Sequence, residues 1–252
     1  VGGSHIVIKR QLPDDRAYMF QNADGRVVFA IPYEEEYLLI GTTDNDHASL
    51  EEPPKITAAE IQYLCDVASH YLAETVTPED VVWHFSGIRP LFNDGASEAT
   101  EATRDYVITQ DRQYDDTLIN VIGGKITTYR KLAEEVLALV DRRTQNRSKR
   151  WTAGTALPGG DFAVLSFDAL VIEAQRHFAF ADPLLVRRLA RLYGTDVWTL
   201  LKDCQQICDL GTHFGAGLYQ VEVDYLVREE WARLAQDIVY RRTKLGLRMT
   251  VE

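Results

Sequence analysis

LINVIGGKITTYRKLAEE, residues 118–135, predicts a strand, a tight glycine turn and the start of a helix. The apolar run ends at Gly123 and Gly124, and glycine lets the backbone pass close to a ligand. The first amide N–H groups of a helix favour negative charge, and Lys125 adds a cation beside them. The segment therefore suits a phosphate, or an electron-rich ring that becomes anionic during reaction. Alone it is weak evidence, because a Gly-Gly turn before a helix is more often a plain connection.

Upstream of this segment, short apolar runs separated by turn residues predict a β-rich half. We expect a meander of mostly antiparallel strands over 5–8, 17–21, 26–32 and 37–43. A helix is expected over 57–74, where Thr57 and Glu60 have capping-box spacing. Extended structure is expected over 81–92, 105–109 and 117–122, with a polar surface loop over 93–103.

The pattern becomes helical downstream of the glycine turn. One helix is expected from Lys125 to about Val140, followed by a polar, basic linker over 141–150. Further helices are expected over 164–178, 183–193, 197–208, 221–227 and 231–243. The predicted fold class is therefore α+β: a mostly antiparallel sheet with helices over residues 1–146, followed by an all-helical domain over residues 147–252.

Composition excludes several classes of protein. The chain has 252 residues, enough for one or two domains, and a net charge of −11, which argues against nucleic acid as the main partner. The same charge argues against binding anionic lipid over a whole face. No apolar run approaches the roughly 20 residues that span a bilayer. Three cysteines and no secretion signal indicate a reducing, cytosolic compartment.

Three side chains are candidates for chemistry. Arg89 in SGIRPLF is expected at a buried strand end, where it needs an anionic partner, either a structural carboxylate or a ligand. Lys125 follows the glycine turn, although most lysines are simply solvated. His5 in GGSHIVI has a pKa range that suits proton transfer, although a histidine beside a strand is more often structural.

The other candidates are interpreted as structural. The remaining histidines show no spacing that predicts a metal site. Cys204 and Cys208 are expected four apart on one helix, where core packing is the usual role. The chain contains no G-x-G-x-x-G, no G-x-x-x-x-G-K-[ST] and no G-x-S-x-G.

Taken together, several segments resemble the flavin-dependent glycerol-3-phosphate dehydrogenase family, within the D-amino-acid-oxidase-like flavoproteins. They are GSHIV (3–7), IPYEEEYLLIGTTD (31–44), SGIRPL (86–91), TRDY (103–106), GGKITTYRKLAE (123–134), LPGGD (157–161) and EVDYLVREEWARLAQDIVYRRTKLGL (222–247). The family begins with a glycine-rich dinucleotide-binding region that is absent here. The resemblance therefore implies the C-terminal portion of such an enzyme. Residues 1–146 would be the end of its FAD- and substrate-binding domain.

The resemblance also implies roles for individual residues. Gly123, Gly124, Lys125, Ile126 and Thr127 would meet the pyrimidine edge of the flavin of FAD, although this chain alone is not expected to retain FAD. Arg89 and Lys125 would bind the anionic group of glycerol 3-phosphate. His5 would lie near the reacting centre, as the proposed base.

The implied reaction is oxidation of sn-glycerol 3-phosphate to dihydroxyacetone phosphate, a step of glycerol metabolism, with electrons passed to a quinone. The resemblance further implies a cytoplasmic protein peripheral to the inner face of the membrane, and leaves a homodimer open. We expect this chain alone to be inactive. Two alternatives remain: a non-catalytic interaction or dimerisation module, and a related flavin oxidase acting on another anionic substrate.

Overall fold

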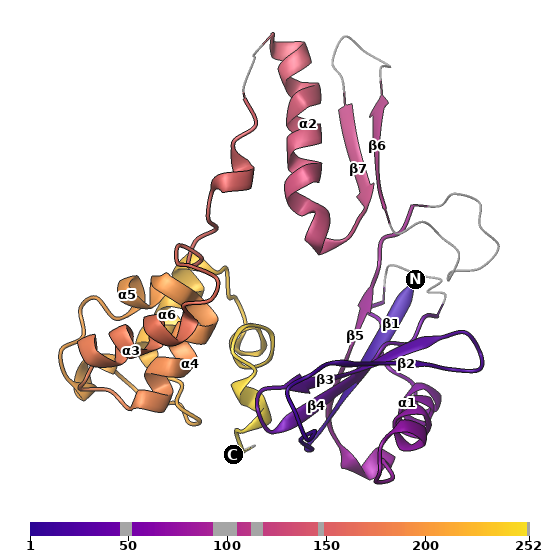
Figure 1. The fold of residues 1–252 in the computed structure, drawn as a ribbon, viewed down its shortest axis with the longest axis horizontal. Helices are drawn as coiled ribbons and strands as arrows, with labels where there is room; N and C mark the ends of the chain where they lie inside the picture. Colours follow the sequence, from indigo (N-terminus) through magenta and orange to yellow (C-terminus); the bar gives the residue numbers. More distant parts are fainter. Residues whose placement is uncertain (46–51, 93–104, 112–117, 146–148, 251–252) are drawn as a thin grey trace. The chain divides into compact units, whose positions relative to one another are not determined.

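The computed structural model describes residues 1–45, 52–92, 105–111, 118–145 and 149–250 (Figure 1). The chain divides into two compact units, Val1–Ala153 and Gly154–Glu252. The predicted fold class is confirmed: the first unit combines antiparallel sheet with helices, and the described part of the second is helical. Within the described residues, no helix is both long and apolar enough to cross a lipid bilayer.

A five-stranded antiparallel sheet forms the body of the first unit. Its strands are β1 (Gly2–Ile8), β2 (Tyr18–Gln21), β3 (Val27–Tyr33), β4 (Tyr37–Gly41) and β5 (Val81–Ile88), in the order β2-β3-β4-β1-β5. The antiparallel pairing agrees with prediction, but the simple meander is wrong because β1 lies between β4 and β5. Nearly every residue of β1 is buried, and a strand flanked on both sides is where such a segment is stable.

Helix α1 (Ala58–Tyr71) covers one face of this sheet. The predicted capping box is confirmed: the Thr57 side chain accepts from the amide of Glu60, and the Glu60 carboxylate accepts from the amide of Thr57. Alternate strand residues face the helix and form one apolar core with it: Ile6, Ile8, Phe20, Val28, Ala30, Leu38, Ile40, Leu64, Cys65, Val67, Ala68 and Val76.

Residues 118–135 have the predicted order of elements: a strand, a glycine turn and the start of a helix. Strand β7 (Leu118–Gly123) pairs with β6 (Tyr106–Asp111) in a two-stranded antiparallel sheet. A 3₁₀ turn (Ile126–Thr128) leads from the glycines into α2 (Tyr129–Thr144). Because α2 continues to Thr144, the first part of the predicted linker is helical.

The second unit contains α3 (Phe167–His177), α4 (Pro183–Tyr193), α5 (Val197–Leu200), α6 (Gln220–Glu229) and a π-helical turn (Asp237–Arg242). Three predicted helices are shorter than expected, and for two of them the difference is large. The helix predicted over 197–208 ends at Leu200, so Cys204 and Cys208 do not share it. The helix predicted from Trp231 does not include that residue, because its positive φ of 56° is incompatible with helical geometry; the π-helical turn spans Asp237–Arg242.

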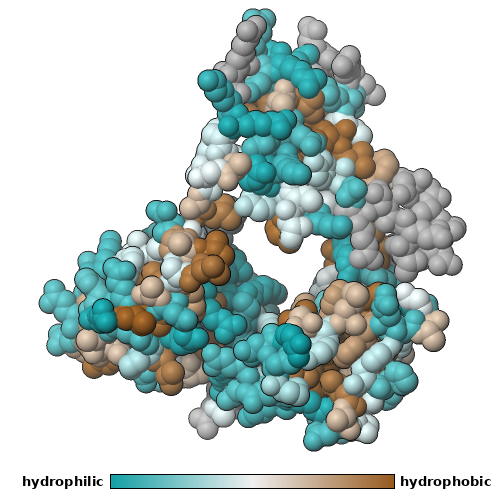
Figure 2. Space-filling view, in the orientation of Figure 1, coloured by the Kyte–Doolittle hydropathy of each residue, from teal (hydrophilic) through white to brown (hydrophobic). Residues whose placement is uncertain are grey.

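The surface of this unit keeps several apolar side chains. Trp231, within the segment predicted to be helical, is 79% exposed. Figure 2 shows hydrophobic patches among hydrophilic surface in the viewed face of each unit.

A buried ion pair lies in the interior of the second unit. Arg188 donates to both carboxylate oxygens of Glu222, at 2.8 and 2.6 Å, and the Tyr193 hydroxyl donates to the same carboxylate at 2.9 Å. Glu222 is only 1% exposed. Burial and then the Glu222 charge raise the pKa of Tyr193 well above its usual range, so its hydroxyl remains a donor. A third bond from Arg188, to the Gly217 carbonyl, joins the 213–219 loop to this pair.

We expect Glu222→Gln to lower the free energy of unfolding of the second unit by about 3–5 kcal/mol, because it leaves the Arg188 charge buried without its counterion. Chemical denaturation followed by circular dichroism measures this loss. Glu229→Gln is the matched control, since Glu229 lies on the same helix in an exposed pair with Arg228. Equal losses in the two variants would contradict the assignment.

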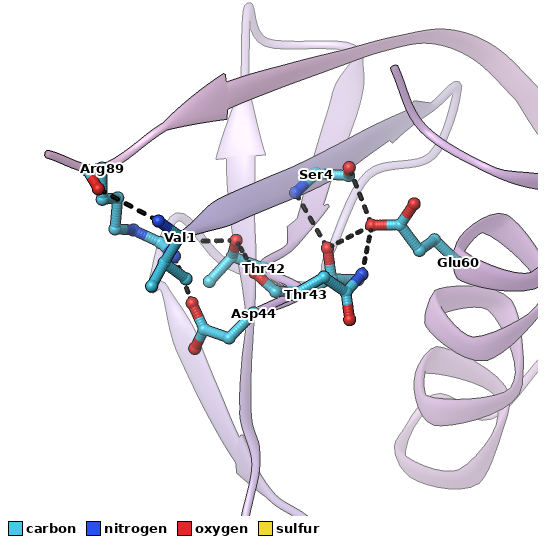
Figure 3. A network of polar contacts seen from close by, with 8 residues as sticks. Val1, Ser4, Thr42, Thr43, Asp44, Glu60 and Arg89 are labelled. Carbon is cyan, nitrogen blue, oxygen red and sulfur yellow. Dashed lines mark hydrogen bonds and ion pairs between the residues drawn. The ribbon is translucent and has the colours of Figure 1, made fainter. Parts of the chain in front are cut away.

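Glu60 connects α1 to the sheet through a network of hydroxyl groups (Figure 3). Its Oε1 accepts from the hydroxyls of Ser4 and Thr43 and from the side-chain Nδ2 of Asn45, at 2.7–3.0 Å. Its Oε2 accepts from the amide and hydroxyl of Thr57. Burial acts to raise the pKa of Glu60, but the bonds from Thr43, Thr57 and Ser4 outweigh it and hold the pKa below 4.5.

We expect Glu60→Gln to destabilise the first unit by about 1–3 kcal/mol at pH 7, because an amide cannot accept all of these bonds. The pKa of Glu60 is lowered in the folded state, so the contribution is complete above the unfolded pKa and is lost as pH falls through the folded pKa. Denaturation measured at pH 7 and then at successively lower pH should therefore show the stabilities of the two proteins converging in acid. Glu74→Gln, at a side chain 81% exposed, is the control; no convergence would contradict the role of Glu60.

Candidate functional site

His5 lies on the sheet face opposite α1, on a strand with a neighbour on each side. The strand register places Met19, Phe29, Gly41, His5 and Phe85 in one row across all five strands. The His5 and Phe85 rings stack at 4.9 Å, with 4° between their planes. A Cβ atom at position 41 would lie 2.2 Å from Cδ2 of His5, so only glycine leaves room for the ring.

The imidazole of His5 is poised to be neutral. Its pKa is lowered first by burial and then by the charge of Arg89, while the charge of Asp44 opposes the shift. Nδ1 is buried and has no hydrogen-bond partner among the described residues. His5 can therefore accept a proton near neutral pH. It does not, however, have the acceptor on its second nitrogen that orients many histidine bases.

Arg89 follows directly the end of β5 and is held by the segment after β4 (Figure 3). Its Nη1 forms an ion pair with Oδ1 of Asp44, and its Nη2 donates to Oγ1 of Thr42 at 2.9 Å. The backbone amide of Arg89 donates to the carbonyl of Val1 at 2.7 Å. The side chains of Arg89 and Asp44 are 31% and 16% exposed. Of the two partners that the sequence left open, a structural carboxylate is therefore present.

Asp44 and Thr42 are site residues that sequence reasoning missed. They lie in the stretch that carries part of the family resemblance, yet nothing in their spacing links them to Arg89, which is 45 and 47 positions away from them. The order of the strands brings these residues together. Because β1 lies between β4 and β5 and is antiparallel to both, the ends of β4 and β5 lie on either side of the start of β1. Gly3 of β1 lies between them, and a Cβ there would be 2.9 Å from Nη2 of Arg89.

The glycine corner has the conformation that the sequence predicted. Gly123 and Gly124 have φ values of 75° and 95°, which favour glycine. The amides of Ile126 and Thr127 have no hydrogen-bond partner in the described part of the chain, and no side chain caps the turn. The Ile126 residue is 86% exposed, and Lys125 is also exposed. Open amide donors beside a cation fit the pyrimidine edge of a flavin, where negative charge develops on reduction.

The predicted site residues fall into two groups. His5 and Arg89 belong to one cluster with Asp44 and Thr42. Gly123, Gly124, Lys125, Ile126 and Thr127 form the corner between β7 and α2. Across the described residues, no hydrogen bond or ion pair joins Lys125 to His5 or Arg89. A shared role of Arg89 and Lys125 in substrate binding therefore stays a prediction.

Two family models match the chain. Residues 1–129 match the FAD dependent oxidoreductase family, and residues 150–251 match the C-terminal domain of alpha-glycerophosphate oxidase. Among curated relatives, a glycerol-3-phosphate dehydrogenase of Pseudomonas aeruginosa is 41% identical, over 98% of this chain and 48% of its own length. A D-erythritol 1-phosphate dehydrogenase of Brucella abortus is 39% identical, over 99% of this chain and 50% of its own length.

A solved structure has the same fold. The X-ray structure of the glycerol-3-phosphate dehydrogenase from Bacillus halodurans, complexed with FAD, matches with a TM-score of 0.77 and 29% identity. The match covers 96% of this chain and 47% of that one. The chain thus spans about half the length of the relatives it matches. The family match and the shared fold lead to one conclusion: this chain belongs to the FAD-dependent oxidoreductase family.

Proposed function

We propose that this chain is the C-terminal half of a flavoenzyme that oxidises sn-glycerol 3-phosphate to dihydroxyacetone phosphate. The observation that carries the proposal is the similarity to a glycerol-3-phosphate dehydrogenase along 98% of the chain, which includes both units. Residues 1–146 would supply the substrate side of the catalytic domain, and residues 147–252 would form a helical domain attached to it.

FAD, when bound, accepts the hydride that leaves C2 of the substrate. In this chain, the corner formed by residues 123–127 would hold the pyrimidine edge of the cofactor. Its unused amides and the Lys125 charge support this assignment, because both favour negative charge at that edge. The upstream half of the enzyme would hold the rest of the cofactor, so the chain alone should neither retain FAD nor turn over substrate.

The chain's own side chains would bind substrate and move a proton. Arg89 and Lys125 would orient the phosphate and offset its charge. His5 would accept the C2 hydroxyl proton at Nε2, because Nδ1 is buried, and its lowered pKa keeps the ring ready to do so. By family resemblance we also propose a quinone as electron acceptor, a homodimer, and a peripheral location on the cytoplasmic face of the membrane.

A second candidate substrate is D-erythritol 1-phosphate. The observation that favours it is the 39% identity to the D-erythritol 1-phosphate dehydrogenase of Brucella abortus over 99% of this chain. Both substrates are polyol phosphates, so the same cations could bind either one. The two substrates differ in the length of the carbon chain, and residues of the upstream half of the enzyme could also discriminate between them.

The reaction is tested with the full-length protein that contains this chain, loaded with FAD. Glycerol 3-phosphate and D-erythritol 1-phosphate are compared by kcat/KM, with an artificial dye and then a soluble quinone as acceptor. We expect glycerol 3-phosphate to be the better substrate and the 252-residue chain alone to be inactive. Turnover of neither polyol phosphate would refute the proposal, and a preference for erythritol 1-phosphate would select the second candidate.

We expect Lys125→Met to lower kcat/KM for glycerol 3-phosphate by about 10- to 100-fold, the loss of one charge-assisted hydrogen bond. Steady-state kinetics of the full-length protein measures this change. Lys131→Met is the matched control, because Lys131 is an exposed lysine on the helix that follows the corner. If both variants keep wild-type kinetics, Lys125 does not contact substrate or cofactor.

A further inference from the structure

Among the residues that the structure describes, the guanidinium of Arg89 is only partly used. A guanidinium carries five N–H bonds, and Arg89 spends one on Asp44 and one on Thr42. The Nε–H and one hydrogen on each terminal nitrogen have no partner among the described residues. Arg89 is thus fixed at two points and still has donors for a further oxygen.

The segment that holds Arg89 is itself fixed on its other side. Residues 42–45 alternate in direction: Thr42 and Asp44 contact Arg89, while Thr43 and Asn45 donate to Glu60 at the start of α1 (Figure 3). The Thr42 hydroxyl donates to the carbonyl of Thr43 at 2.8 Å, which leaves its oxygen to accept from Arg89. Each contact therefore restrains the position of the guanidinium relative to the sheet.

The restrained guanidinium is close enough to His5 to affect it. The charges of Arg89 and Asp44 both act on the imidazole, with opposite signs. Gly3 leaves space for Nη2 beside β1, two residues before His5 on the same strand. Fixing Arg89 thus also fixes the position of its unused donors relative to the candidate base.

We propose that Asp44 and Thr42 are positioning residues, which hold the Arg89 guanidinium beside His5 with its remaining donors directed to the anionic group of the substrate. The inference rests on the proposed function, because it concerns the same substrate. Asp44 does not touch the substrate in this proposal; it acts through Arg89.

Removing the charge of Asp44 should change substrate binding in opposite directions, depending on whether Asp44 positions Arg89 or acts by its charge alone. A carboxylate near an anionic substrate repels it, so removing the charge of Asp44 should strengthen binding if charge alone mattered. If Asp44 orients Arg89, the same change should weaken binding, because the donors lose their alignment. Thr42→Val removes the second contact without changing any charge, and it should act in the same direction.

The first experiment uses this chain without cofactor or substrate. Nitrogen NMR of the Arg89 guanidinium reports rotation of the group about its Nε–Cζ bond. We expect slow rotation in the wild-type chain and faster rotation in Asp44→Asn and Thr42→Val, while thermal melting shows that both variants remain folded. Equally slow rotation in all three proteins would overturn the proposal.

The second experiment uses the full-length, FAD-loaded protein. We expect Asp44→Asn and Thr42→Val to lower kcat/KM for glycerol 3-phosphate by about 10- to 100-fold, mainly through a higher KM. Asp24→Asn is the matched control, because Asp24 forms an exposed pair with Arg26 in the same unit. Unchanged or improved kcat/KM in Asp44→Asn would overturn the positioning role.

The two proposals can fail separately. If the wild-type enzyme does not oxidise glycerol 3-phosphate, the proposed function fails, and the NMR measurement still decides whether Asp44 and Thr42 restrain Arg89. If the wild type is active and the variants match it, the proposed function stands and the positioning role fails.

Discussion

The alternation of side chains along β1 is the constraint on which the first unit depends. Successive residues of a strand point to opposite faces, so Ser4 and His5 cannot serve the same face. Ser4 points to α1 and donates to Glu60, while His5 lies in the row of residues on the opposite face. One strand therefore supports the apolar core on one side and the candidate site on the other. Its place between β4 and β5 makes this possible, since both neighbours then contribute residues to each face.

The Arg89–Asp44 pair shows how a candidate binding residue can also be structural. The sequence presented a structural carboxylate and a ligand anion as alternatives, yet an arginine has enough donors to serve both. The carboxylate stabilises a half-buried charge, and within the described part of the chain no partner takes the remaining N–H bonds. Because the guanidinium is already held in place, little reorganisation is needed when an anion binds, and less free energy is lost to ordering the side chain.

The second unit also contains an arginine paired with a carboxylate, but that pair lies in the interior. Arg188, Glu222 and Tyr193 satisfy one another almost completely in the interior, and no described observation links them to a ligand. Such a cluster fixes how α4 and α6 pack, because any other arrangement would leave a charge unpaired in the core. Arg89 and Arg188 thus have different surroundings: Arg188 pairs with a carboxylate that is almost fully buried, whereas Arg89 pairs with a carboxylate that is 16% exposed, at the end of β5.

Local chemistry in the sequence determined much of this protein. Hydrophobic alternation predicted the antiparallel strands, Thr57 and Glu60 predicted the start of α1, and Gly123 and Gly124 predicted the corner before α2, because each depends on residues close together in the chain. Helix prediction failed where local apolar spacing continued past the true end, as at Leu200, or where Trp231 adopts a positive φ. Only the tertiary structure decided three features: the strand order, the pairing of Arg89 with Asp44, and the packing of the His5 ring against Gly41. The pairing of β1 with β4 and β5, like the other two contacts, joins residues 30 or more positions apart. Such contacts follow from which strands become neighbours, and no local pattern specifies that.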